Sequence, residues 1–166
     1  MKIRQETISD IQTITDITVA AFKTLEISNK TEQFIINALR SDGALPISLV
    51  AETEGKIIGH VAFSPVTISD GSKGWYGLGP VSVLPEHQKQ GIGKSLINNG
   101  LSMLRDMDGS GCVLVGDPNY YKHFGFENFP QLIHEGVPQE VFLALPFNEV
   151  IPNGIVVFHK AFLAKE

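Results

Sequence analysis

The sequence has little of what marks several classes of protein. It has one cysteine, Cys112, which excludes an intrachain disulfide and a cysteine-cluster metal site. Its 13 basic and 18 acidic residues leave a net charge of −5, whereas a protein that binds nucleic acid by charge carries a basic excess. No apolar run approaches the roughly 18 to 20 residues of a membrane span. We therefore expect no bound metal, no nucleic-acid partner and no membrane insertion.

The size and apolar content favour one folded domain in a reducing compartment. Hydrophobic residues make up 43% of the 166 residues, which is too apolar for intrinsic disorder. A chain of this length buries roughly two thirds of its unfolded surface as one domain. Residues 1–6 lack the apolar core of a secretory signal. Together with the single cysteine, this predicts a cytoplasmic protein.

Hydrophobic periodicity and turn residues predict a mixed α/β fold, with a sheet flanked by helices. Ser9 is the expected N-cap of the first helix, with Gln12 completing a capping box. The predicted helices are 10–23, 31–41, 92–107 and a short one at 119–124. The predicted strands are 2–6, 47–53, 56–68, 75–84, 112–116, 141–146 and 155–161.

The segment 88–95 places glycines between a strand and the start of a helix, near Gly91. The first N–H groups of a helix have no internal partner and carry the positive end of its dipole. Glycines let a ligand approach that backbone, and Lys89 and Lys94 add positive charge. The segment therefore predicts a phosphate or pyrophosphate site. The plain alternative is a strand, turn and helix in which the glycines serve only the tight turn.

Two nucleotide-binding motifs fail by residue count. The run 93–95, Gly-Lys-Ser, matches the end of G-x-x-x-x-G-K-[ST], but position 88, where the first glycine belongs, is Gln88. A dinucleotide G-x-G-x-x-G fails because Gly91 and Gly93 are followed by Leu96. A nucleotide-binding protein is therefore the weakest interpretation.

Three motifs resemble those of the GNAT superfamily of N-acetyltransferases. Gln88, Gly91 and Gly93 form the Gln-x-x-Gly-x-Gly pattern of its acetyl-CoA loop. Residues 79–83, Gly-Pro-Val-Ser-Val, resemble the fourth strand of that fold. Residues 121–126, Tyr-Lys-His-Phe-Gly-Phe, resemble the segment after its fifth strand. The three motifs occur in the family's order and spacing.

The resemblance extends over the whole chain. Residues 116–121 and 59–65 are similar to a bacterial subgroup often called YhbS-like. The implied fold is a mixed, mostly antiparallel sheet flanked by helices, with its fourth and fifth strands splayed apart. We expect residues 1–150 to form the acetyltransferase domain and residues 151–166 to be a C-terminal strand extension of it. That extension either completes the sheet or pairs with another subunit, so a homodimer is one alternative.

The resemblance also implies a place for acetyl-CoA as co-substrate, with its pantetheine arm between the splayed strands. Pro80 removes a ladder donor from a central strand and independently predicts a bulge there, the alternative being a simple edge strand. In the family the fourth strand contacts acetyl and pantetheine through its backbone, and the loop wraps the pyrophosphate. The expected cofactor-binding residues are Val81, Ser82, Val83, Gln88, Lys89, Gln90, Gly91, Ile92, Gly93, Lys94 and Ser95.

The implied chemistry is direct attack of a primary amine on the thioester. An amine with a pKa near 10.4 has to lose a proton, and the departing thiolate benefits from a donor. Tyr121 stands where the family carries that donor, with Tyr120 adjacent; a purely packing role is the alternative. The residue sequence singles out no base, and the candidates are Glu26, Glu32, Glu52 and His60.

The resemblance thus implies an acetyl-CoA-dependent N-acetyltransferase that acts on a small-molecule or peptide amine of unknown identity. The alternative from another class is a non-catalytic regulatory module that binds CoA or acyl-CoA. Tyr121 separates the two, because a module that only binds has no need of a thiol donor. Phe22, Leu25 and the loop to Asn29 are expected on the acceptor side.

Overall fold

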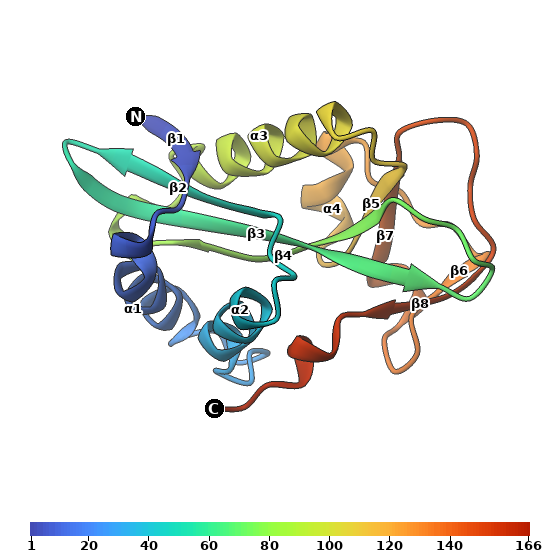
Figure 1. The fold of residues 1–166 in the computed structure, drawn as a ribbon, viewed down its shortest axis with the longest axis horizontal. Coiled ribbons are helices and arrows are strands. Elements are labelled where there is room, and N and C mark those ends of the chain that lie inside the picture. Colours follow the sequence, from blue (N-terminus) through green and yellow to red (C-terminus); the bar gives the residue numbers. More distant parts are fainter.

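An open, twisted sheet runs through the molecule (Figure 1). The computed structural model describes all residues from 1 to 166. The strand order is β1-β2-β3-β4-β5-β7. Neighbouring strands are antiparallel except β4 and β5, which are parallel. This confirms the predicted mixed, mostly antiparallel sheet. The strands are β1 Lys2–Gln5, β2 Ile47–Thr53, β3 Lys56–Ile68, β4 Trp75–Val83, β5 Gly111–Val115 and β7 Phe142–Pro146.

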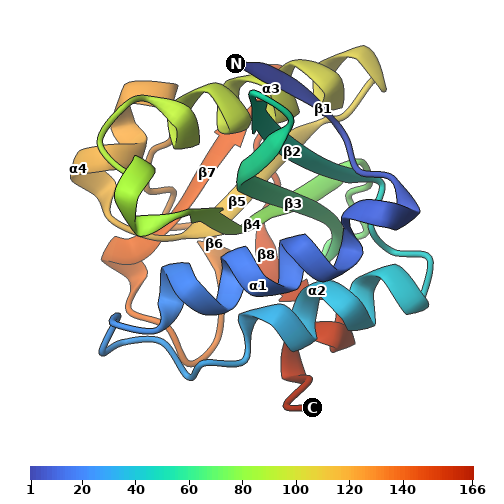
Figure 2. The ribbon, with the colours of Figure 1, turned by 90° about the vertical axis from the view of Figure 1, so that its left-hand side faces the viewer.

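Helices cover both faces of this sheet, as Figure 2 shows. Helices α1 (Ile11–Phe22) and α2 (Glu32–Ser41) lie on one face, and α3 (Ile92–Asp106) lies on the other with the short α4 (Pro118–Tyr121). Helices α1, α2 and α3 each bury an apolar stripe against the strands, as the spacing of their apolar residues predicts. The three long predicted helices and the strands up to residue 146 agree with these bounds to within one residue at each end. The short helix predicted at 119–124 is α4 followed by a 3-10 turn, Lys122–Phe124. No helix has both the length and the apolar character needed to cross a membrane.

The C-terminal segment adds a short branch to the sheet. β8 (Gly154–Phe158) pairs antiparallel with the far end of β3 and parallel with β6 (Leu132–Ile133). Two residues are too short to show a periodicity, so the sequence did not predict β6. The strand predicted to reach residue 161 is wrong beyond Phe158, because the His159 side chain accepts a bond from the N–H of Ala161 and starts a 3-10 turn over Lys160–Leu163.

The entry to α1 also differs from the prediction. A 3-10 turn, Ile8–Asp10, precedes the helix, and the capping box joins Thr7 to Asp10 rather than Ser9 to Gln12. The Thr7 N–H donates to Asp10 Oδ2 at 2.7 Å. Arg4, from β1, pairs with the same carboxylate oxygen at 2.7 Å. The Asp10 carboxylate is thus held by both the Thr7 N–H and the Arg4 guanidinium.

Candidate active site

Strands β4 and β5 separate soon after they meet. They pair over three positions only, Trp75–Gly77 with Gly111–Val113. β4 continues to Val83 and β5 to Val115 without further pairing between them. The edge of β4 beyond Gly77 therefore presents backbone N–H and C=O groups to no strand. This is the splay that the resemblance implied.

A bulge in β4 lies at the same point. Gly79 and Pro80 stand opposite the single residue Ala62 of β3, because the register shifts between its two neighbours. Gly79 has a φ of 134°, which only glycine adopts readily. The predicted bulge is thus confirmed, and it turns the second half of β4 away from β5.

The loop after β4 presents a run of unpaired backbone N–H groups. Those of residues 89–94 donate to no acceptor in the protein, and the first N–H of α3 that does is Ser95, to the Gly91 carbonyl at 3.0 Å. Lys89 and Gly91 have left-handed φ values of 64° and 81°, which fold the loop tightly onto the helix start. Successive free N–H groups at a helix N-terminus form an anion-binding arrangement.

A cavity of about 620 Å³ lies over this loop. Its walls include most of the predicted cofactor-binding residues, namely Val81, Val83, Gln88, Lys89, Gly91, Ile92, Gly93 and Lys94. Gln88 donates from Nε2 to the Val83 carbonyl at 3.1 Å and so ties the loop to the strand. His87 and Tyr120 also line the cavity; the motif gave no reason to assign His87 to it.

Three predicted residues do not line this cavity: Ser82, Gln90 and Ser95. The Ser82 side chain is buried on the strand face opposite to Val81 and Val83, beside His60 of β3. A contact from Ser82 to a ligand would therefore be made by its backbone. Gln90 is exposed, and Ser95 sits one turn into α3.

A second cavity, of about 360 Å³, lies where β4 and β5 diverge. Its walls come from α1, α2, β4, β5, α4 and the C-terminal turn. Val81 lines both this cavity and the larger one, so the two meet at β4. The two adjacent tyrosines line different cavities. Tyr120, 42% exposed, lines the larger cavity, and Tyr121 lines the smaller one.

Tyr121 is held in place by close packing. A Cβ added to Gly116 would lie 2.5 Å from the Tyr121 ring, so only glycine fits there. The ring of Phe126 packs edge-on to it, with centroids 6.0 Å apart. Burial raises the pKa of Tyr121 to about 12, and the neighbouring Tyr120 adds to the effect. The Tyr121 hydroxyl therefore keeps its proton at neutral pH, as a hydrogen-bond donor must.

The structure distinguishes among the acidic candidates for the base. Glu32, at the start of α2, lines the same cavity as Tyr121 and accepts a bond from Ser28 Oγ at 2.7 Å. Glu52 instead pairs with Arg4 at 3.1 Å at the end of β2. Glu26 is exposed in the loop after α1 and lines neither cavity.

His60 is fully buried between the sheet and α1, away from both cavities. Ser48 Oγ donates to Glu6, so it accepts from His60 Nε2, 2.8 Å away. The imidazole is then neutral with its proton on Nε2, and Nδ1 has no partner. Burial lowers the pKa of His60 to about 4. This histidine is a buried structural group.

The chain contains no group of three or more His, Cys, Asp or Glu side chains arranged to hold a metal ion. The two cavities offer free backbone N–H groups, the phenols of Tyr120 and Tyr121, the carboxylate of Glu32, and the side chains of His87, Lys89 and Lys94. Free N–H groups at a helix start can bind an anion, and phenol and carboxylate groups can donate and accept protons.

Residues 11–126 match the model of the acetyltransferase (GNAT) family, which is more than half of the chain. The chain belongs to this family. Among known proteins, an uncharacterized N-acetyltransferase of Escherichia coli K12, YhbS, is 39% identical over 97 residues, 58% of each chain. YjhQ of the same organism is 33% identical over 122 residues, 72% of this chain and 65% of YjhQ. The aligned regions thus cover less than two thirds of either relative.

Solved structures of this family superpose over nearly the whole chain. A GNAT family acetyltransferase from Brucella melitensis, in complex with acetyl-CoA, is 46% identical with a TM-score of 0.87 and covers 97% of both chains. YhbS from Escherichia coli, in complex with CoA, is 31% identical with a TM-score of 0.84, covering 98% of this chain and 91% of YhbS. The expected resemblance to the YhbS-like subgroup of the GNAT family is confirmed.

Proposed function

We propose that this protein transfers the acetyl group of acetyl-CoA to a primary amine by direct attack on the thioester. The observation that carries the proposal is the meeting of the two cavities at Val81. One cavity has the free N–H groups of an anion site, and the other holds Tyr121 and Glu32. The acetyl-CoA complex of the Brucella melitensis relative supports the choice of ligand.

We propose that the free N–H groups of residues 89–94 hold the pyrophosphate, helped by the charges of Lys89 and Lys94. The unpaired edge of β4, at Val81, Ser82 and Val83, offers backbone partners to the pantetheine amides. Oriented backbone dipoles explain how a chain of net charge −5 can bind a polyanion.

The proposed reaction forms one bond and breaks one. The amine nitrogen bonds to the carbonyl carbon while the carbon–sulfur bond breaks, and the electron pair leaves on sulfur. An ammonium nitrogen loses two protons in the process: Glu32 takes the first and releases it to solvent, and the second ends on the CoA thiol. Tyr121 donates a hydrogen bond to the sulfur as its charge develops.

Titration with acetyl-CoA, followed by thermal unfolding and calorimetry, tests binding. A ligand at 100 times its Kd stabilises the folded state by about 2.7 kcal/mol, so a clear rise in Tm is expected. Release of the CoA thiol with a panel of amines then tests transfer. Folded protein that millimolar acetyl-CoA does not stabilise would refute the proposal. Stabilisation without thiol release for any amine would favour the non-catalytic CoA-binding module instead.

A further inference from the structure

The smaller cavity contains a single charged side chain, Glu32. No lysine, arginine or histidine lines it. From this lining we propose that the acceptor is an apolar primary amine that carries no anionic group, with its ammonium at Glu32 and its carbon body on the apolar walls. The inference rests on the proposed function, because it names the acceptor for the same site.

The charge of Glu32 is available to a ligand. Its carboxylate accepts a bond from the neutral Ser28 hydroxyl and forms no ion pair. The nearby Lys30 is held elsewhere: its ammonium donates to the carbonyl of Phe22, at 2.8 Å, and to that of Leu25. Lys23 and Lys30 line another small cavity, which shares only Phe22 with this one. The acceptor cavity is therefore negative, which suits an ammonium group.

An acceptor with a carboxylate or phosphate would meet the opposite situation. Its anion would lose water in a mostly apolar cavity, close to the like charge of Glu32 and without a cation to pair with. Burying an unpaired charge and placing like charges together are both costly. The lining thus selects against amino acids and phosphorylated amines.

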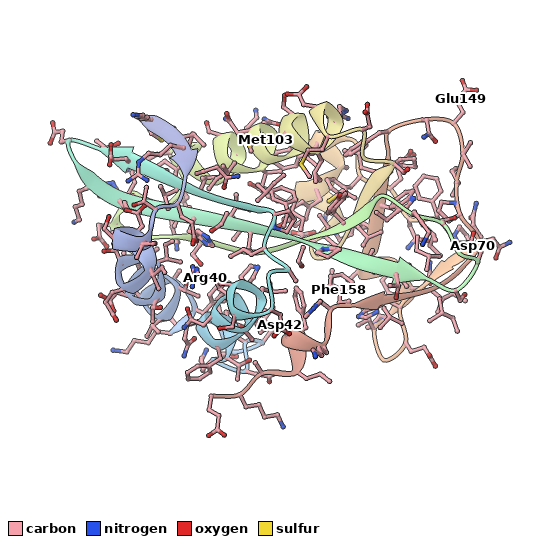
Figure 3. The ribbon with its side chains drawn as sticks, viewed as in Figure 1. Arg40, Asp42, Asp70, Met103, Glu149 and Phe158 are labelled. Atoms are coloured by element: carbon pink, nitrogen blue, oxygen red, sulfur yellow. The ribbon has the colours of Figure 1, made fainter.

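The apolar walls come from opposite ends of the chain. Phe22 and Ile35 belong to α1 and α2, and Val115 ends β5. Phe162 comes from the C-terminal turn, where its ring packs edge-on to that of Phe158 in β8, with centroids 5.1 Å apart (Figure 3 labels Phe158). A volume of about 360 Å³ is in the range of small-molecule pockets. These walls offer apolar contact to the carbon skeleton of an amine.

Three acceptors that share one ring and one amine position test the proposal in the thiol-release assay. Phenethylamine has no second functional group, phenylalanine adds a carboxylate, and phenylalaninamide adds a neutral group of the same size. We expect kcat/KM for phenethylamine to exceed that for phenylalanine at least about tenfold, the like-charge penalty being the cause. Phenylalaninamide should recover most of the difference, which separates charge from size.

A charge added to the wall should change this preference. Val115 is 47% exposed and lines the cavity, so Val115→Arg is expected to fold and to add a cation to the cavity that contains Glu32. The ratio of kcat/KM for phenylalanine to that for phenethylamine should rise about tenfold. The matched control is Val157→Arg on β8, 55% exposed and outside the cavity, which should leave the ratio unchanged.

The outcomes separate this inference from the function it rests on. Phenylalanine used as well as phenethylamine, or a ratio that Val115→Arg does not move, overturns the acceptor class while acetyl transfer stands. A peptide amine preferred over all three compounds does the same. Binding of acetyl-CoA without transfer to any amine overturns both the acceptor class and the proposed function.

Discussion

At the scale of single residues, the main question is which of two adjacent tyrosines donates to the sulfur. Tyr121 faces the smaller cavity from a packed position, and Tyr120 faces the larger cavity with 42% of its surface exposed. Sequence spacing favoured Tyr121, and the cavity that it lines is the one that also holds Glu32. A donor to the sulfur is needed where the two cavities meet, because that is where the thioester would lie.

Tyr121→Phe should lower kcat about 100-fold or more and leave the Kd of acetyl-CoA unchanged. The substitution removes the proton donor but keeps the ring that packs on Phe126 and Gly116. Thiol release and calorimetry measure the two quantities. Tyr120→Phe is the matched comparison and should cost less. The reverse order of effects would assign the donor to Tyr120.

His60 predicts how stability depends on pH. Its pKa is about 4 in the folded protein, below the value near 6.5 of an exposed histidine, because burial disfavours the charged form. The unfolded chain therefore binds more protons between these values, and the free energy of unfolding falls as the pH drops from about 6.5 to 4, by roughly 3 kcal/mol. The hydrogen bond from Arg4 lowers the pKa of Asp10 to about 2, so the contribution of Asp10 to stability is lost only at lower pH.

Urea unfolding between pH 7 and pH 4.5 tests this dependence. The His60→Gln variant can keep a hydrogen bond to Ser48 but has no titrating ring. Its free energy of unfolding should change less across that range than that of the wild type. Equal slopes for the two proteins would remove His60 as the cause.

Close packing of α3 on β3 is the decisive feature at the scale of single elements. A Cβ at Gly100 would lie 2.0 Å from Cε1 of Phe63, which is buried in the main core. Glycine in a helix costs about 1 kcal/mol of helix stability relative to alanine. At position 100 this cost is accepted because glycine allows α3 to lie close to the sheet. That short distance sets where the N-terminus of α3, and its free N–H groups, lie relative to β4.

Gly100→Ala should destabilise the protein by about 1 to 3 kcal/mol, although alanine is the better helix former. The added methyl group forces Phe63 or α3 to shift. Urea unfolding measures the change, and Asn98→Ala, exposed on the same helix, is the control that should be neutral or stabilising. The additional substitution Phe63→Leu should recover part of the loss. A Gly100→Ala variant more stable than the wild type would contradict the packing argument.

At the scale of the whole molecule, the C-terminal residues join segments that are distant in sequence. We propose that residues 1–150 and 151–166 form one folding unit. β8 pairs with β3 and with β6, and Ala161 is buried against Leu39 of α2. These strand partners of β8 belong to its own chain. A homodimer formed through β8 therefore stays a prediction that the strand pairing does not support.

Calorimetry should therefore show a single unfolding transition for the full chain. Removal of residues 151–166 deletes buried side chains such as Val156 and Ala161 and should lower Tm by at least about 5 °C, which corresponds to one to three kcal/mol at this size. Removal of residues 164–166, largely exposed, should leave Tm unchanged. Two separate transitions would show that the two segments fold independently.

The sequence by itself determined the order of the main elements and the place of the glycine loop at the start of α3. These features depend on local rules, namely the spacing of apolar residues and the positions of turn residues. At the start of α3, the N-cap residue Gly91 has a left-handed φ, which glycine adopts readily. The bulge at Gly79 and Pro80 was predictable for the same reason, because proline cannot donate to a ladder. Each of these features is encoded within a few neighbouring residues.

Only the tertiary structure decided which side chains share a cavity. Glu32 and Phe162 are 130 positions apart and line the same cavity. Such contacts depend on how helices pack on the sheet and leave no periodic signal along the chain. The glycine loop could thus be located from the sequence, whereas the charge and shape of the smaller cavity emerged only when both ends of the chain came together around β4.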